Sequence, residues 1–141
     1  MEAVVPYLLF NGNAKEAFDF YAKGLGGNIV MSTTFGEAPE GACAAGQEDK
    51  IMHAVLQADG ITLMCSDCPP DKSATLGDNI SLSLNFTDSA TMDKTFEALA
   101  EGGTVTMALQ DTFWGARFGM LKDKFGTNWM FNHDKSPKQH P

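Results

Sequence analysis

The stretch W-G-A-R-F-G-M-L-K-D-K-F-G-T-N-W-M-F-N, residues 114–132, brings together aromatic residues, an arginine and three glycines. Two short apolar runs, Arg117–Leu121 and Asn128–Asn132, flank the segment K-D-K-F-G. Apolar runs separated by turn residues predict a β-hairpin. Within its turn, Asp123 and Gly126 are expected to shape the backbone and to take no part in chemistry.

This hairpin has a counterpart in the first half of the chain, which indicates an internal repeat. An offset of 66 residues aligns Gly60 with Gly126 and Met64 with Met130. An offset of 76 residues aligns further identical residues in the earlier parts: Leu8 with Leu84, Phe10 with Phe86, Phe20 with Phe96, Ala22 with Ala98, Gly26-Gly27 with Gly102-Gly103, and Met31 with Met107. The change of offset places about ten extra residues in the first copy, where residues 35–50 read as a long loop. The common order of the matches predicts two copies of one supersecondary unit.

Each copy is predicted to begin with a strand, Val5–Phe10 or Ile80–Phe86, and to continue into a helix. Asn13 should start the first helix, and Asp88 or Ser89 the second, because these side chains can accept hydrogen bonds from first-turn amides. The two glycine pairs should end the helices, since glycine adopts the left-handed conformation at little cost. Three strands should then follow in each copy: Ile29–Phe35, Ile51–Ala58 and Ile61–Ser66, and Val105–Gln110, Arg117–Leu121 and Asn128–Asn132.

The fold class that follows is α+β, with two β-α-β-β-β modules at about 4–67 and 79–133. We expect one domain over residues 1–134 and a flexible tail at 135–141, because the tail has no hydrophobic periodicity. A chain of 141 residues is long enough to bury a core of its own.

Composition restricts the possible partners. The formal net charge of −8 disfavours nucleic acid and anionic membranes and mildly favours neutral or cationic ligands. The sequence contains no long apolar run, so neither a membrane span nor a signal peptide is expected, and the protein should be cytoplasmic. Its three cysteines are expected to be reduced thiols.

Strand alternation sorts side chains between the two faces of each expected sheet. On the first strand of the second copy, Leu82, Leu84 and Phe86 should face the helix, while Ser81, Ser83 and Asn85 should face water or a cavity. On the last strands, Met64 and Met130 share one face and Trp129 takes the other. Alternation alone does not decide which of these two faces is the open one.

Three phrases carry a family resemblance: P-Y-L-L-F-N-G-N-A-K-E-A-F-D-F-Y-A-K-G-L-G-G, M-H-A-V-L-Q-A-D-G and F-W-G-A-R-F-G-M-L-K-D-K-F-G-T-N-W-M-F-N. Together they resemble the PhnB-like branch of the vicinal oxygen chelate superfamily, which includes glyoxalase I and the fosfomycin- and bleomycin-resistance proteins. The resemblance implies modules that curl into a half-open, barrel-like sheet around a pocket, with helices outside, usually in a homodimer. It also places Met64 and Met130 on the pocket side.

Metal-using members of that superfamily carry His, Gln or Glu on the first and last strands of each module. The matching positions here fall near Val5, Met64, Ser81 and Met130, the first to within one residue. None of these side chains is a usual ligand for a divalent ion. We therefore expect no metal and no other cofactor, although the pocket itself should remain.

The candidate ligand-binding residues are Tyr7, His53, Met64, Ser83, Trp114, Arg117 and Met130. His53 could act as an acid or base, or could be a hydrogen-bonded structural residue. Arg117 could hold a carboxylate or phosphate, or could form a salt bridge. Trp114 and Tyr7 could stack on an aromatic or cationic ligand, or could pack in the core. No residue is assigned a catalytic role.

Cys65-Ser-Asp-Cys68 has the spacing of a metal or redox motif, and Cys43 or His53 could add ligands. No second C-x-x-C is present, so this role is the minor alternative.

The leading hypothesis is a dimer that binds a small molecule on its curved sheet without metal, with no reaction assigned. The alternative is a lyase, isomerase or transferase whose divalent ion is held by His53, Glu37 or Cys65. A third possibility is a purely structural or regulatory dimer.

Overall fold

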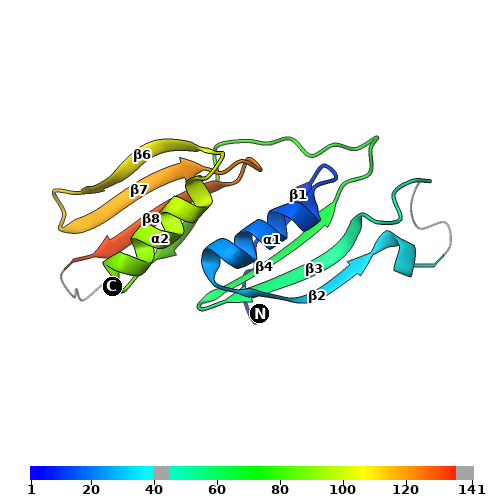
Figure 1. The fold of residues 1–141 in the computed structure, drawn as a ribbon, viewed down its shortest axis with the longest axis horizontal. Coiled ribbons are helices and arrows are strands. Elements are labelled where there is room, and N and C mark those ends of the chain that lie inside the picture. The colour runs from blue at the N-terminus through cyan, green and yellow to red at the C-terminus, as the bar shows by residue number, and fades with distance from the viewer. Residues whose placement is uncertain (40–44, 136–141) are drawn as a thin grey trace. The chain divides into compact units, whose positions relative to one another are not determined.

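In a computed structural model of the chain, residues 1–39 and 45–135 are described, and the chain divides between Thr75 and Leu76 into two compact units. Each unit holds one β-α-β-β-β module, so the α+β class and the two-module organisation are confirmed (Figure 1). The grouping of both modules into one domain, 1–134, stays a prediction. The end of the expected tail, 136–141, lies outside the described residues. Within the described ranges, no helix is long and apolar enough to cross a membrane.

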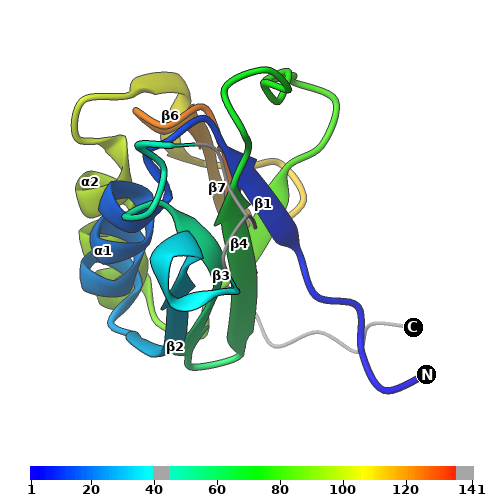
Figure 2. The same cartoon turned by 90° about the vertical axis from the view of Figure 1, so that its right-hand side faces the viewer.

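In the first module, β1 (Tyr7–Phe10) leads into α1 (Ala14–Leu25), and an antiparallel meander follows. The meander consists of β2 (Asn28–Thr34), β3 (Ile51–Ala58) and β4 (Ile61–Asp67). It returns so that β4 lies parallel to β1, which gives the sheet order β1-β4-β3-β2. Helix α1 packs against one face of this sheet, and Figure 2 shows the other face without a helix on it.

The second module repeats this arrangement with β5 (Leu82–Asn85), α2 (Ser89–Ala100), β6 (Thr104–Asp111), β7 (Ala116–Lys122) and β8 (Asn128–Asp134). Its sheet order is β5-β8-β7-β6, with β5 parallel to β8. Neither four-stranded sheet closes into a barrel. The predicted hairpin of residues 114–132 is therefore confirmed as β7 and β8 with the turn between them.

The hydrogen-bond register confirms both repeat offsets. Tyr7 lies beside Met64 in the first sheet, and Ser83 lies beside Met130 in the second. The differences are 83 − 7 = 76 and 130 − 64 = 66, the two offsets that the sequence matches gave.

The first strand of each module is shorter than predicted. β1 begins at Tyr7 because Pro6 has no backbone N–H to donate, although its carbonyl accepts from the Met64 amide at 3.0 Å. β5 begins at Leu82, and the Ile80 carbonyl instead accepts from the Asn128 side-chain amide at 3.1 Å.

The loop predicted over residues 35–50 begins with a 3₁₀ helix, Phe35–Glu37, in which Thr34 and Glu37 form a capping box. Residues 40–44 of that loop, Cys43 among them, lie outside the described part of the chain.

The two helices start in different ways. Asp88 precedes α2 and its side chain accepts from the Thr91 amide at 2.8 Å, as predicted. Asn13 directly precedes α1, as predicted, but its side chain makes no capping bond. The carboxylate of Asp67, at the end of β4, instead accepts from the Gly12 and Ala14 amides, each at 3.0 Å.

Asp67 also joins the strands of the first sheet. Its other oxygen accepts from the Ile51 amide at 2.9 Å, so this one buried carboxylate ties together the start of α1, the start of β3 and the end of β4. In the second module, Asp123 is similarly buried and accepts from the Phe125 and Thr127 amides and from the Trp129 indole. The turn-shaping role predicted for Asp123 is confirmed.

Candidate functional site

Helix α1 covers one face of the first sheet and leaves the other uncovered. The side chains in register with Met64 lie on the uncovered face. Tyr7 lies beside Met64 on one side and Val55 lies beside it on the other. By alternation, the same face includes His53 on β3 and Met31 on β2, which pairs with Val55. The opposite face is the core, where Ala54, Leu56, Leu63 and Cys65 are buried under the helix. Met64 is therefore on the face without a helix, the open face, and a pocket over it stays a prediction.

Tyr7 and His53 form a pair on this open face. They stand on β1 and β3, which flank β4, and the Tyr7 hydroxyl lies 3.1 Å from His53 Nδ1. The two rings are stacked, with centroids 5.7 Å apart and an interplanar angle of 21°. Tyr7 is 46% exposed, so the pair offers a flat aromatic surface to solvent. The core-packing alternative for Tyr7 does not match this exposure.

The uncovered face of the second sheet carries Ser83, Met130 and Met120 in one row across β5, β8 and β7. Asn85 and Asn132 form the next row, and their side-chain amides lie 3.3 Å apart. Phe118 pairs with Asn132 and shares this face. The second open face is thus lined by a hydroxyl, two thioethers, two amides and an aromatic ring.

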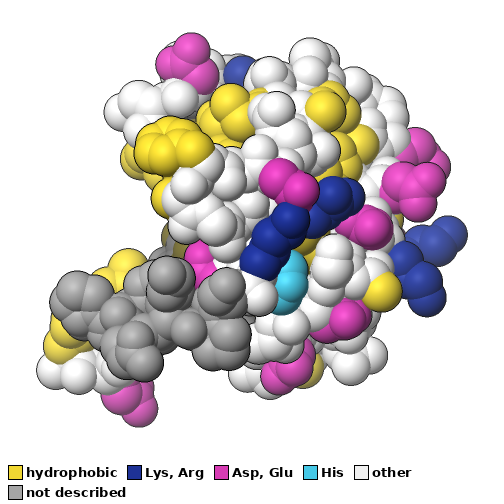
Figure 3. Space-filling view, turned by 90° about the vertical axis from the view of Figure 1, so that its left-hand side faces the viewer, with side chains coloured by type: hydrophobic (Ala, Val, Ile, Leu, Met, Phe, Trp, Pro, Cys, Tyr) yellow, Lys and Arg dark blue, Asp and Glu magenta, His cyan; other side chains and the backbone are white. Residues whose placement is uncertain are grey.

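Trp114 belongs with this second open face. It lies in the turn between β6 and β7, is 53% exposed, and its ring packs edge-on against Phe118 with centroids 6.2 Å apart. Phe113 beside it is 98% exposed. Figure 3 shows the side of the molecule on which this turn lies, with hydrophobic side chains at the surface and acidic and basic side chains intermixed.

Arg117 lies on the other face of the same sheet, away from Met130. It pairs with His133 rather than Asn132, and its guanidinium makes a 2.9 Å ion pair with Asp93 of α2. Its Nε is buried and has no hydrogen-bond partner among the described residues. The structure therefore supports the salt-bridge alternative, and it does not bring Arg117 together with Ser83, Trp114 and Met130.

Known proteins provide an independent comparison. The model of the Glyoxalase/Bleomycin resistance protein/Dioxygenase superfamily matches residues 3–131 of this chain. The chain belongs to this superfamily. Protein YjdN of Escherichia coli is 35% identical over 136 residues, which cover 90% of this chain and 92% of that protein.

Solved structures agree with this assignment. Protein PA1353 from Pseudomonas aeruginosa is 45% identical, with a TM-score of 0.85 over 95% of this chain and 98% of that one. The PhnB protein from Bacillus cereus is 27% identical, with a TM-score of 0.75 over 94% of this chain and 99% of that one. The resemblance to PhnB-like relatives is thus supported along nearly the whole chain.

The residues at the positions that would hold the superfamily's divalent ion are not suited to bind such an ion here. The first-strand positions were placed near Val5 and Ser81, but the residues in register with Met64 and Met130 are Tyr7 and Ser83. A phenol, a hydroxyl and two thioethers are poor ligands for a hard or borderline divalent ion, which prefers imidazole and carboxylate. Among the described residues, no group of three or more His, Cys, Asp or Glu converges.

Two of the alternative metal ligands, Glu37 and Cys65, are already engaged or buried. Glu37 is held in its capping box by the Thr34 amide and hydroxyl, which lower the pKa of its carboxyl. Cys65 is fully buried on the helix side of the sheet, whereas His53 is on the open side. Burial raises the pKa of the Cys65 thiol to about 12, with the Asp67 charge adding to this, so the thiol is protonated at neutral pH. Cys65 and Cys68 are both free.

Some open-face residues were not predicted. Met120 and Phe118 lie on the same face as Met130, and the sequence held a usable signal for both. Once the turn is assigned, alternation on the two hairpin strands places Met120 opposite Met130.

Proposed function

We propose that this member of the superfamily binds a small molecule on the open faces of its sheets and does so without a divalent metal. The observation that carries the proposal is the Tyr7–His53 pair, a stacked and hydrogen-bonded aromatic surface beside Met64 on a face that no helix covers. Such a surface suits a ligand with a flat aromatic or a cationic part, which can stack on the phenol ring.

The chemistry of the two open faces supports this choice. Met31 and Met64 on the first face, and Met120 and Met130 on the second, are polarizable and adaptable side chains. The Ser83 hydroxyl and the Asn132 amide can orient a ligand by hydrogen bonds. The charge of −8 opposes an anionic ligand at long range and is compatible with a neutral or cationic one.

No specific contact supports the alternative function, a metal-dependent lyase, isomerase or transferase. His53 already makes a hydrogen bond through Nδ1, Glu37 is held in its capping box, and Cys65 is buried on the helix side of the sheet. His53 and Tyr7 could still exchange a proton with a bound molecule, so the proposal leaves the reaction open and assigns binding alone.

Methyl NMR on protein labelled at methionine Cε tests the proposal directly. We expect that, in a screen of small aromatic and amine-bearing metabolites, a binding compound shifts the Met64 and Met31 methyl signals in a saturable way. Met92, which is fully buried within α2, is the internal control and should stay unchanged. Tyr7→Phe keeps the ring and removes the hydroxyl, so it should weaken binding less than Tyr7→Ala.

The metal-free part of the proposal has its own measurement. Elemental analysis of protein purified without a metal-chelating tag should find well under one equivalent of Zn, Ni, Mn or Fe per chain. About one equivalent that is lost in His53→Ala would contradict it. A screen in which no compound moves an open-face methionine would favour the structural or regulatory dimer instead.

We further propose that the protein is a cytoplasmic homodimer. Each sheet has two edge strands, and the outer strands β2 and β6 expose Val30, Met31, Val105 and Met107. Unpaired strand edges with apolar side chains are usually covered by another element or chain. Light scattering over a dilution series should give twice the chain mass into the low micromolar range, and a monomer at those concentrations would overturn this proposal.

A further inference from the structure

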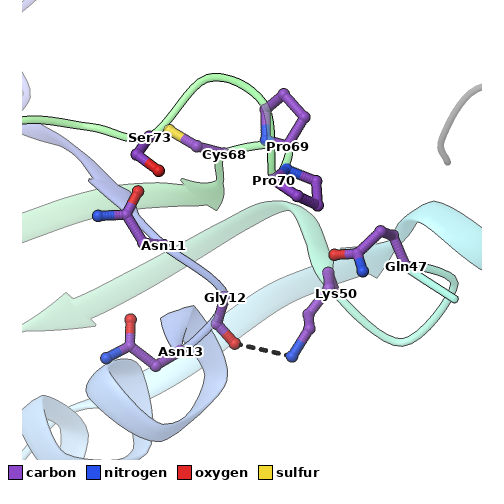
Figure 4. Close-up of a pocket in the computed structure, with 9 residues that line it drawn as sticks. All are labelled: Asn11, Gly12, Asn13, Gln47, Lys50, Cys68, Pro69, Pro70 and Ser73. Atoms are coloured by element: carbon purple, nitrogen blue, oxygen red, sulfur yellow. Dashed lines mark hydrogen bonds between the residues drawn. The ribbon is translucent and has the colours of Figure 1, made fainter.

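A second candidate site lies in the first module, at the corner where β1 runs into α1. Here a cavity of about 310 Å³ is enclosed by three segments: the start of α1, the residues before β3 and the loop after β4 (Figure 4). Its lining residues are Asn11, Gly12, Asn13, Gln47, Lys50, Cys68, Pro69, Pro70 and Ser73. None of Tyr7, His53 and Met64 lines it, so this cavity is distinct from the open face. The volume falls at the small end of the range for metabolite sites.

The walls of the cavity are held in place by hydrogen bonds. The Asn11 side chain bonds the Ala74 backbone twice: it accepts from the Ala74 amide at 2.8 Å and donates to the Ala74 carbonyl at 3.1 Å. The loop after β4 is thereby fixed to the end of β1. Across the cavity, Lys50 Nζ donates to the Gly12 carbonyl at 2.9 Å. A site whose walls are fixed before binding loses less entropy when a ligand enters.

The charge inside this cavity is positive, unlike that of the chain as a whole. Among its lining residues, Lys50 carries the only charged side chain. Its ammonium has three donors and the Gly12 carbonyl takes one, which leaves donors for a ligand. The nearby Asp67 does not line the cavity, because its carboxylate is buried and turned to the Gly12, Ala14 and Ile51 amides.

The remaining lining groups can serve a polar ligand. The Asn13 side chain makes no capping bond to α1, and Gln47 offers a second amide. Ser73 contributes a hydroxyl, while Pro69 and Pro70 form an apolar wall (Figure 4). Because the Gly12 and Ala14 amides are already bonded to Asp67, recognition here depends on side chains and not on the helix end.

We propose that this cavity binds a small carboxylate, whose charged end meets the Lys50 ammonium and whose remainder lies against the two prolines and the side-chain amides. The site is independent of the proposed open-face function. Failure of one proposal would therefore leave the other untouched.

Amide NMR with acetate as the probe, at constant ionic strength, tests this site. We expect saturable shifts at Gly12, Asn13, Lys50 and Ser73 in the millimolar range. Acetamide has the same shape without the charge, and it should produce no saturable shift there. Lys50→Gln should weaken acetate binding at least threefold, roughly what one partly exposed ion pair contributes. The matched control is Lys72→Gln, an exposed lysine of the loop after β4 that does not line the cavity, and it should bind acetate as the parent does.

Since Lys50→Gln also removes the bond to Gly12, a second variant keeps the test decisive. Ser73→Phe leaves that bond intact and fills the cavity mouth, so it should abolish the acetate shifts while the other amide signals stay in place. Acetate shifts that persist unchanged in both variants would overturn the proposal. Equal shifts with acetamide, or shifts centred on Tyr7 and His53, would overturn it as well.

Discussion

Asp67→Ala should lower the free energy of unfolding by about 3–5 kcal/mol, a large effect for a substitution outside the apolar core. The substitution leaves the Gly12, Ala14 and Ile51 amides without their acceptor in a region where little water can replace it. Bonds to a carboxylate contribute about 1.5–3 kcal/mol each, but the three are not additive because they share one side chain. Urea unfolding followed by circular dichroism measures the change.

Hydrogen exchange would show that the loss comes from these three amides. In Asp67→Ala, the Gly12, Ala14 and Ile51 amides should exchange faster than expected from the global destabilisation. Asp67→Asn should be less damaging: if its oxygen takes the Oδ1 place, it still accepts from Gly12 and Ala14, and the Ile51 amide alone loses its acceptor. Asp71→Ala, at an exposed position in the following loop, is the control and should change stability by less than about 0.5 kcal/mol. Equal stabilities for Asp67→Ala and this control would refute the role assigned to Asp67.

The features of the fold that the sequence predicted are those set by local pattern and by the repeat. Alternation placed Met64 and Met130 on one face and Trp129 on the other, and the register of β1 with β4 and of β5 with β8 agrees with it. The paired residues of the two sheets differ by the same two offsets, which agrees with two copies of one unit.

The role of Asp67 was not predictable in this way. Its partners are 16 to 55 residues away in the chain, and no local spacing marks a carboxylate that will cap a helix from a distant strand. The second module also lacks this device, since Asp88 caps α2 and the position that matches Asp67 holds His133. Capping propensity alone pointed to the Asn13 side chain, and it missed the distant carboxylate.

In the candidate site, too, some features follow from local sequence pattern and others do not. Trp114 and Arg117 are three positions apart in one motif, yet the ring packs against Phe118 on the open face and the guanidinium pairs with Asp93 on the helix side. Alternation along β7 would have separated Arg117 from Met120, but the motif suggested a single cluster. The cavity beside Lys50 is formed by three segments that only the folded chain brings together, so no linear pattern marks it.

Gly27→Ala should lower the free energy of unfolding by about 2–4 kcal/mol, because the second glycine of the pair is required for close approach. A Cβ at Gly27 would lie 2.6 Å from the Gln57 carbonyl oxygen and 2.8 Å from the Ala58 Cβ, both on β3. Backbone atoms cannot move aside as the end of a flexible side chain can, so the helix end must shift from the sheet. Thermal and urea unfolding of the variant measure this cost.

Gly26→Ala provides the comparison that separates close approach from backbone conformation. Gly26 has φ of +67° and nothing within 4 Å of the place a Cβ would occupy, so the substitution should cost only the strain of a left-handed alanine, about 1 kcal/mol. Gly77→Ala meets nothing closer than the Asn79 side chain at 3.5 Å and should be nearly neutral.

In the second module, a Cβ at Gly103 would meet the Lys122 carbonyl and Asp123 as closely as a Cβ at Gly27 would meet β3. Gly103→Ala should therefore destabilise the protein as much as Gly27→Ala. From the smallest to the largest loss of stability, the expected order of the alanine variants is Gly77, then Gly26, then Gly27 with Gly103. If Gly26→Ala proved costlier than Gly27→Ala, the pair would serve only to end the helix. If the predicted order holds, the repeated glycine pair combines two requirements, a left-handed helix end followed by a point where no side chain fits between helix and sheet.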